Sequence, residues 1–571
     1  MEHTSKLTKH DIQAYLADVD PRIGAYIQQC ETQIAKLAEI GFKLSTERHL
    51  PSLLNAIIEE AMRITNCDGG TLYLRTEDNR LGFEIMKTRS MNVDMGGTSK
   101  TPIPDFIYPV KLYADDGTPN HNMISAHVAL TGETMNIPDA YEDETFDFTG
   151  TKAFDQKNNY RSKSFLTIPM TNHEDDIIGV LQLLNAIDED KDEIITFSTE
   201  MQELIESLAS QAAVAITNVR LIADLEKLLD SFIQLIADAI DEKSPYTGGH
   251  CSRVPALSMM LAEKVNATNE GPFKDINFSP EDMNELRIAS WLHDVGKITT
   301  PEYVVDKATK LETIYDRVNE VVVRFEVLKR DVEIEYLRKC LEAGADPNRL
   351  AELDVQKNAE LKKLEEELEF IQICNTGGEF MADEKKERVM EIGQRTFVQR
   401  GEETRLLSDD WIKNLNISRG TLNDDEREKI NDHIVVTIDM LEKLPFPKHL
   451  KRVPEFAGGH HETMIGTGYP RGLKKEDMSI QARIMGIADI FEALTASDRP
   501  YKKGKTLSEA MRIMGFFKQD HHIDPDLFDV FLRENVFQEY AEEYLDQKYI
   551  DEVDVGTYLE MQPKPLDQVR R

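Results

Sequence analysis

The sequence predicts a multidomain protein in which an α+β domain is joined by a long helix to an all-α domain with a helical insertion. The 571 residues exceed what one hydrophobic core usually holds. Short β-rich runs (TLYLR, SFLTIPM and IIGVLQLLNA) alternate with polar loops before about residue 220. From about residue 236 onward, apolar residues recur at helical spacing instead. These three observations divide the chain into two domains of different fold class.

The charge and the cysteine content limit the partners and the compartment. A formal net charge of -37 argues against binding a nucleic-acid polymer, which requires clustered Lys and Arg. A small anion remains compatible, because bound metal ions and a few bases can reverse the local potential of a pocket. The five cysteines form no CxxC pair, and no run approaches the roughly 20 apolar residues that cross a bilayer. We therefore expect a cytoplasmic protein that does not enter a membrane.

Residues 1–45 are predicted to form one or two helices that lead into the α+β domain at 46–220. The runs CDGGTLYL, SFLTIPM and GVLQLLNA, closed by TEMQELIESLASQAAVAITN, resemble those of a GAF domain. The resemblance implies a central antiparallel sheet with flanking helices, a pocket for a small molecule, and dimerisation through the terminal helices. Asn185 and Phe197 match the pattern of members that bind cyclic nucleotides. However, Ala186 stands where that pattern has a lysine, and a Met-Gln pair stands where it has Asp-Glu. The expected ligand is therefore an unidentified small molecule.

A connecting signalling helix is predicted over 205–240. Six apolar residues in it are spaced alternately by four and three positions: Leu221, Leu225, Leu228, Phe232, Leu235 and Ala239. This spacing is typical of the seam of a parallel coiled coil and favours a homodimer. The alternative is that these residues pack onto their own domain, because the run covers fewer than about three heptads.

The all-α domain at 236–571 contains seven residues that can bind metal ions through nitrogen or oxygen. They are His250, His293, Asp294, His433, His460, His461 and Asp489. Imidazole combined with carboxylate suits iron, manganese or zinc, and no cysteine lies near them as it would in a structural zinc site. A single histidine of this kind is more often an ordinary core or surface residue. Asp294, however, ends an apolar helical run, where a buried carboxylate needs a partner such as a metal ion.

Longer motifs around these residues resemble the HD-GYP family, a branch of the metal-dependent phosphohydrolases with an HD domain. They are PYTGGHCSRV, LHDVGKI, and HHETMIGTGYPRGL continuing into ARIMGIADIFEALTASDRPYK. The resemblance implies that the seven residues hold two divalent ions, iron or manganese, with Asp294 bridging them. A third ion is less favoured, because Tyr246 stands where some members have a glutamate ligand.

Lys297 follows His293 by four positions, which places both on the same face one helical turn apart. Its ammonium group can therefore hold a substrate phosphate beside the metals. The alternative is a lysine that interacts only with the helix dipole or with solvent. We assign catalytic roles to Asp294 and Lys297. Asp294 is expected to act by holding the metal ions, and Lys297 by countering the negative charge of the transition state.

The GTGYP segment is predicted to be a loop, because its glycines permit unusual backbone angles and Pro470 fixes its exit. The resemblance implies that Gly468, Tyr469 and Pro470 shape the substrate pocket. Arg483 and Arg499 are further candidates for contact with phosphate. Ordinary structural salt bridges are the alternative for both arginines.

A long connector separates Asp294 from His433, whereas typical family members have a short one. The segments KATKLE and GTLNDDEREKINDH resemble the two halves of the usual connector, which places a helical insertion at about 312–418. Its composition is that of charged, exposed helices, with Gly344 and Pro347 marking a turn. We expect the insertion near the active-site entrance, as a lid, a dimer contact or a partner surface.

The resemblance implies a phosphodiesterase that hydrolyses cyclic di-GMP to linear pGpG, and in a second step to GMP, under control of the GAF domain. Two alternatives remain. The substrate is another cyclic dinucleotide, such as cyclic GMP-AMP, since no residue identifies the bases. Otherwise, the protein is a non-catalytic module that senses a dinucleotide.

Overall fold

The computed structural model describes residues 21–188, 190–243, 249–378, 380–496 and 504–569. The chain divides into two compact units, residues 1–228 and 229–571, and each is described by itself. Two candidate positions from the sequence, Tyr246 and Arg499, lie outside the described residues. Within the described ranges, no helix combines the length and apolar character that a membrane crossing requires.

The N-terminal unit is built around one antiparallel sheet of eight strands, in the order β3-β2-β1-β7-β6-β5, with β4 paired to β2 and β8 to β7. The strands are β1 (Cys67–Arg75), β2 (Arg80–Thr88), β3 (Val93–Gly96), β4 (Val110–Lys111), β5 (Met135–Ile137), β6 (Phe165–Thr171), β7 (Ile177–Ile187) and β8 (Ile194–Ile195). Its helices are α2 (Pro21–Thr46), α3 (Leu50–Thr65), α4 (Ile124–Thr131), α5 (Thr149–Asn158) and the start of α6 (Thr199–Lys243). The predicted α+β fold with a central antiparallel sheet is confirmed.

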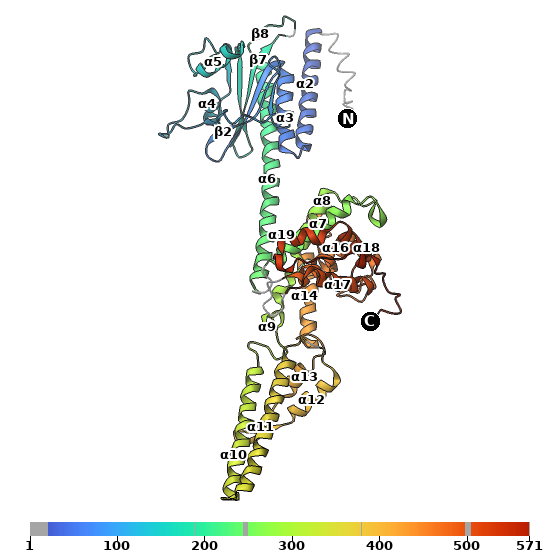
Figure 1. Ribbon diagram of the computed structural model, residues 1–571. Helices are drawn as coiled ribbons and strands as arrows, with labels where there is room; N and C mark the ends of the chain where they lie inside the picture. The colour runs from blue at the N-terminus through green and yellow to red at the C-terminus, as the bar shows by residue number, and fades with distance from the viewer. Residues whose placement is uncertain (1–20, 189, 244–248, 379, 497–503, 570–571) are drawn as a thin grey trace, which may run out of the picture. The chain divides into compact units, whose positions relative to one another are not determined.

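Alternation of side chains along the strands supplies a core to each face of this sheet. In β1, Leu72 and Leu74 join the core that contains the apolar faces of α3 and α6, whereas Tyr73 between them packs beside Val128 of α4. Figure 1 shows α2 and α3 on one side of the sheet and α4 on the other. Both faces are therefore covered by helices.

Helix α6 is continuous over 45 residues and covers the predicted connecting segment. Its last turns place Ile233, Ala237 and Ile240 in the core of the C-terminal unit. The larger residues of the predicted seam lie on another face, where between 49 and 63% of each side chain is exposed: Leu221, Leu225, Leu228, Phe232 and Leu235. The structure therefore does not support the alternative, in which these residues pack onto their own domain.

The C-terminal unit is helical around one core in which Phe456, Phe491 and Phe531 are fully buried. Its α-helices outside the insertion are α7 (His250–Ala267), α8 (Pro280–Leu292), α9 (Glu302–Val305), α14 (Asp424–Glu442), α15 (Val453–Gly459), α16 (Ile480–Thr495), α17 (Leu507–Gln519), α18 (Pro525–Arg533), α19 (Val536–Tyr544) and α20 (Val555–Glu560). Short 3-10 helices are η1 (Gly271–Phe273), η2 (Val295–Thr299), η3 (Lys448–Leu450), η4 (Lys475–Asp477) and η5 (Gln547–Tyr549). The predicted all-α class is confirmed for this part of the chain.

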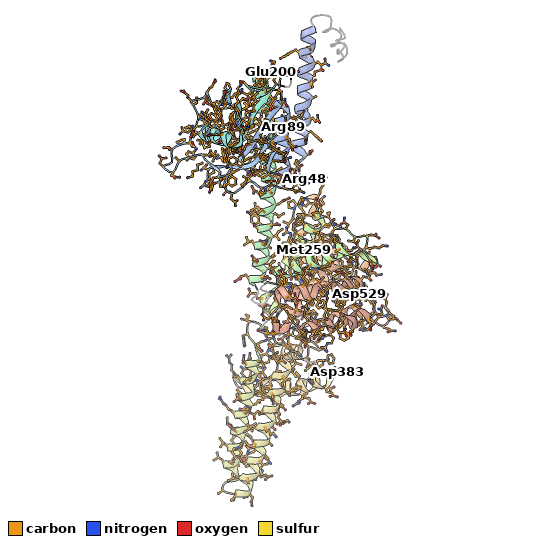
Figure 2. All side chains as sticks on the ribbon, turned by 45° about the horizontal axis from the view of Figure 1, so that its top comes forward. Arg48, Arg89, Glu200, Met259, Asp383 and Asp529 are labelled. Atoms are coloured by element: carbon orange, nitrogen blue, oxygen red, sulfur yellow. The ribbon has the colours of Figure 1, made fainter. Side chains whose placement is uncertain are left out.

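The segment between α9 and α14 has a separate core around Phe325 and Trp411. It contains α10 (Val318–Ala343), α11 (Pro347–Asn375), α12 (Asp383–Gly393), β9 (Thr396–Gln399), β10 (Glu402–Arg405) and α13 (Asp409–Leu415). Figure 2 labels Asp383, which begins α12, in this segment and Asp529 in the helical core. The β9–β10 hairpin differs from the purely helical expectation. Its turn uses Arg400 and Gly401 at positive φ, which suits a tight hairpin.

Two buried lysines join the beginning and the end of this segment. Lys307 Nζ donates to both carboxylate oxygens of Glu426, at 2.8 and 2.7 Å. Lys310 Nζ donates to the carbonyl oxygens of Leu415 and Ile417, at 2.9 and 2.8 Å. These contacts span more than a hundred residues of chain, so they hold the two ends of the insertion together.

Replacing Lys307 by methionine should destabilise this junction strongly. The side chain of Lys307 is 0% exposed and that of Glu426 is 11% exposed, so removing the lysine leaves a buried carboxylate without its counter-charge. Breaking such a pair typically costs about 3–5 kcal/mol, measured as the free energy of unfolding in urea. The matched control is Lys413→Met in the exposed pair with Asp425, which should change nothing measurable. Equal stability of the two variants would contradict the assignment.

Candidate metal centre

His293 and Asp294, the HD pair, lie directly after the C-terminal end of α8. A capping box formed by Ser279 and Asp282 begins this helix, and it ends at Leu292, so His293 and Asp294 follow directly. The side chains of this pair are 0 and 2% exposed. Burial of an aspartate to this extent requires compensating charge.

Gly296 brings this segment against α14, which carries His433. A Cβ at Gly296 would collide with the carbonyl oxygen of His433 and with the backbone of Thr437. The Gly296 amide also donates to Thr437 Oγ1 at 2.9 Å. Only glycine permits this close approach of η2 to α14. As a result, His433 Nε2 lies 3.2 Å from Asp294 Oδ1.

The candidate ligands form two groups on either side of Asp294. One group is His250, His293 and Asp294, and the other is His433, His460 and His461; the ligand atoms within each group lie within 4.8 Å of one another. Asp294 Oδ2 is 3.3 Å from Nε2 of both His250 and His293, while Oδ1 faces His433. Each carboxylate oxygen therefore faces a different group.

Asp489, from α16, extends the first group. Its Oδ1 lies 3.4 Å from His250 Nε2 and 3.9 Å from His293 Nε2. The structure thus brings together all seven candidate ligands that the sequence singled out.

Several ligand atoms in this cluster are buried and make no hydrogen bond within the described residues. They are Nε2 of His250, His293, His433 and His460, and Oδ1 of Asp294. Buried polar atoms normally have partners, so a converging set without them is the signature of a site for a cation. Burial also lowers the pKa of His460 well below its usual range and that of His461 to about 4, which leaves their nitrogen lone pairs free to bind. The donor set fits divalent metal ions.

In three of these histidines, the other ring nitrogen donates to a backbone carbonyl and fixes the orientation of the ring. Nδ1 of His293 donates to the carbonyl oxygen of Ser290 at 2.7 Å, and Nδ1 of His460 donates to that of Ala457 at 2.6 Å. His433 makes the same contact with Ile430. Backbone carbonyls three residues earlier therefore aim each Nε2 inward.

His250 differs, because its Nδ1 contacts a carboxylate. Glu492 Oε2 lies 2.5 Å from this atom, and Glu492 Oε1 accepts from Arg253 Nε at 2.7 Å. Burial opposes ionisation of Glu492, but His250 and Arg253 lower its pKa to about 2. Sequence reasoning missed Glu492; its spacing of three positions after Asp489 on one helix was the available signal.

Lys297 borders the cluster, with 23% of its side chain exposed, and pairs with Asp294 Oδ2. Burial alone would raise the pKa of Asp294, but the charges of Lys297 and His293 hold it well below its usual range. Burial lowers the pKa of Lys297, whereas Asp294 and Asp489 raise it, with a net increase. Lys297 therefore stays protonated next to the candidate ligands.

The GTGYP loop is held by Glu462, which accepts from the backbone amides of Arg471 and Leu473 at 2.7 and 2.9 Å. A Cβ at Gly468 would meet the backbone of His461 and Glu462 at 2.5–2.6 Å, so the loop folds back onto the ligand segment only with glycine there. Tyr469 consequently stacks on His461, with ring centroids 4.8 Å apart. Pro470 follows Tyr469 through a cis peptide bond.

Arg483 has a structural partner. It pairs with Asp524, which is fully buried and also accepts from Lys475 at 2.9 Å. This pairing matches the salt-bridge alternative, so Arg483 serves a structural role and is not a substrate contact in the proposed site.

Comparison with known families agrees with this architecture. The GAF domain family matches residues 49–216, and two HD domain families match residues 247–344 and 410–527. The gap between the HD matches falls within the insertion. A 3'3'-cGAMP-specific phosphodiesterase of Vibrio cholerae is 44% identical over 14% of this chain and 19% of its own length. A cyclic di-GMP phosphodiesterase of Pseudomonas aeruginosa is 46% identical over 13% of this chain and 17% of its own length.

Each of these relatives is thus matched over less than a quarter of its length. Among solved structures, the GAF domain of an Acinetobacter phosphoenolpyruvate-protein phosphotransferase is similar at 16% identity over 34% of this chain and 98% of that one, with a TM-score of 0.25. The fold and the clustered ligands define a GAF domain followed by an HD domain. Within that class, the HHETMIGTGYP segment is similar to the motif of the HD-GYP family.

Proposed function

We propose that this protein is a metal-dependent phosphodiesterase that hydrolyses a cyclic dinucleotide, with cyclic di-GMP as the leading substrate. The observation that carries the proposal is the pair of three-residue ligand groups joined by Asp294, with the ammonium group of Lys297 beside them. The names of the matched relatives supply the substrate class.

Asp294 holds the two groups together, and His250, His293, His433, His460, His461 and Asp489 surround it as ligands. Two divalent ions bound there, iron or manganese, would act as Lewis acids toward a phosphate oxygen and lower the pKa of water. Lys297 binds a non-bridging phosphate oxygen and counters the charge of the transition state. Tyr469, stacked on His461, presents an aromatic face and a hydroxyl group to the substrate. Gly468 and Pro470 set the path of that loop.

A substrate panel tests the proposal. The full chain, loaded with Mn(II) or with Fe(II) under anaerobic conditions, is incubated with cyclic di-GMP, 3'3'-cGAMP and cyclic di-AMP, and the products are separated by chromatography. We expect cyclic di-GMP to give pGpG first and GMP more slowly. Preference for 3'3'-cGAMP would reassign the substrate within the same chemistry. Stoichiometric metal with no product from any of the three would contradict the proposed function.

We propose that the protein works as a homodimer through the exposed seam of α6. The seam has coiled-coil spacing, and Leu225 and Leu235 are 63 and 62% exposed in the single chain. A second copy of the same helix would cover these side chains. Regulation by an unidentified small molecule in the GAF domain, and a location in the cytoplasm, belong to the same proposal.

Replacing both Leu225 and Phe232 by glutamate should convert the dimer to a monomer. The changes place like charges opposite each other at two positions of the seam. Light scattering coupled to gel filtration measures the mass against the 65.2 kDa of one chain. Gln234→Glu, on an exposed position outside the seam, is the control and should remain dimeric. A monomeric unaltered chain at micromolar concentration would contradict the dimer.

A further inference from the structure

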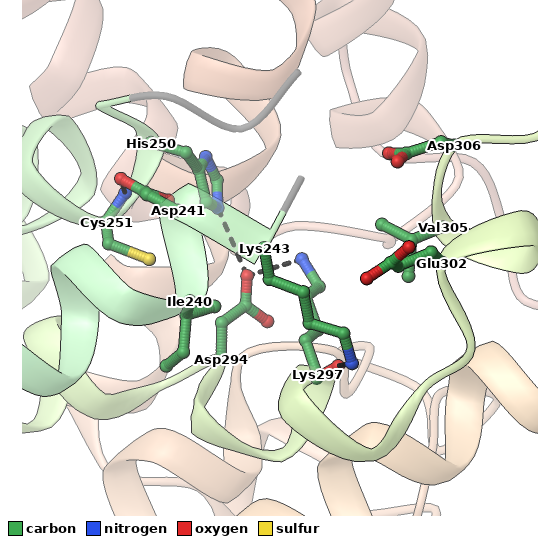
Figure 3. A pocket seen from close by; sticks show the side chains of 10 residues that line it. All are labelled: Ile240, Asp241, Lys243, His250, Cys251, Asp294, Lys297, Glu302, Val305 and Asp306. Carbon is green, nitrogen blue, oxygen red and sulfur yellow. Dashed lines mark hydrogen bonds and ion pairs between the residues drawn. The ribbon is translucent and has the colours of Figure 1, made fainter. Parts of the chain in front are cut away.

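The last turn of α6 forms one wall of a small cavity beside the metal centre. Ile240, Asp241 and Lys243 of α6 line this cavity together with His250, Asp294 and Lys297. The space measures about 10 Å³, which is room for no more than about one water molecule. Helix α6 is therefore packed closely against the segments that carry the candidate ligands (Figure 3).

Asp241 holds the beginning of α7. Its Oδ2 accepts from the backbone amides of Gly249 and Cys251, at 2.9 and 3.3 Å. These two residues flank His250, the first residue of α7 and a candidate ligand. Since Gly249 and the start of α7 offer no side-chain cap of their own, α6 supplies the acceptor.

Lys243 holds the segment that follows the HD pair. Its ammonium group donates to the carbonyl oxygens of Lys297 at 3.2 Å and Thr300 at 2.8 Å, and also to that of Ile298. An ammonium group has three donors, and here all three meet the backbone of η2 and its C-terminal residue. The position of Lys297 beside Asp294 therefore depends on where α6 ends.

We propose that the last turn of α6 positions the catalytic centre, with Lys243 as the residue that transmits a displacement of α6 to the segment 297–300. The inference rests on the proposed function and specifies how that activity is regulated. Helix α6 begins in the N-terminal unit and ends at Lys243. A conformational change in that unit that shifts the helix would therefore be transmitted to Lys243 along the helix itself. Burial of Ile233, Ala237 and Ile240 keeps α6 in register with the C-terminal core.

The first test compares Lys243→Met with Asp238→Asn, an exposed change one turn earlier on the same helix. Turnover of bis(p-nitrophenyl) phosphate by the Mn(II)-loaded full chain should fall about 10- to 100-fold in kcat for Lys243→Met, with little change in KM. Hydrogen exchange of the Lys297 and Thr300 amides should accelerate, while bound manganese per chain stays the same. Lys243→Arg, which keeps the donors, should recover part of kcat. Unchanged exchange at these amides in Lys243→Met would overturn the proposal.

The second test displaces α6 deliberately. Ala237→Leu adds bulk on the buried face, whereas Gln234→Leu adds it at an exposed position outside the seam as a control. We expect Ala237→Leu to accelerate exchange at 297–300 in the native background and to add nothing in the Lys243→Met background. Equal effects of Ala237→Leu in both backgrounds would show that another contact transmits the shift. Hydrogen exchange is measured without turnover. An inactive native chain would therefore contradict the proposed function, but the exchange data would still test the role of Lys243.

Discussion

Replacing His293 and Asp294 together by alanine should abolish phosphodiester hydrolysis, with a loss of at least about a thousandfold in kcat. The two changes remove the carboxylate whose oxygens face both ligand groups and one imidazole of the first group. In the proposed two-metal site, the remaining histidines could not replace the carboxylate that would bridge the ions, so both ions should lose affinity. Measurement of manganese or iron per chain after gel filtration should show the loss directly.

The matched control is the double variant His449→Ala with Asp439→Ala, which removes the same two residue types from exposed positions of the same unit. It should keep both its metal and its activity. If the His293 and Asp294 variant retained full turnover, the metal centre would be wrongly assigned. If it lost metal while an unaltered chain showed no turnover, the site would bind metal for another purpose.

The sequence was sufficient to predict which residues cluster, because several of them stand in short motifs. His293 and Asp294 are adjacent, as are His460 and His461, and the first pair follows a helix whose apolar spacing is visible in the sequence. The α+β class of the N-terminal unit was predictable from its β-rich runs, and the antiparallel sheet from the resemblance to a GAF domain. Local patterns of this kind depend on residues a few positions apart.

Contacts between distant residues were not predictable. Lys307 and Glu426 lie at opposite ends of the insertion, and no local pattern indicates that they pair. The same holds for Lys243, whose partners are backbone carbonyls at 297–300 that carry no sequence signal. The seam of α6 was visible as a pattern, but the pattern alone could not say that a different face, with Ile233 and Ala237, packs into the C-terminal core.

Glu492 provides the second large effect that we expect. Its carboxylate lies 2.5 Å from His250 Nδ1 and is 0% exposed, whereas the described partners of His293, His433 and His460 at this position are neutral carbonyl groups. Burial lowers the pKa of His250, but Glu492 and Asp294 raise it to about 10, so the environment of this ring strongly favours a positive charge. A metal ion at Nε2 would benefit from the same negative charge behind the ring.

Glu492→Gln should therefore weaken metal binding about 10- to 100-fold at the site that contains His250, and Glu492→Ala should weaken it further. Glutamine keeps the size and can still accept from Nδ1, so it separates the charge of Glu492 from its role in orienting the ring. Competition with a fluorescent chelator gives the two manganese dissociation constants, and only one should change by this amount. Glu476→Gln, an exposed change in the same unit, is the control. Equal affinities for the Glu492 and Glu476 variants would mean that the carboxylate serves only Arg253, whose Nε donates to its other oxygen at 2.7 Å.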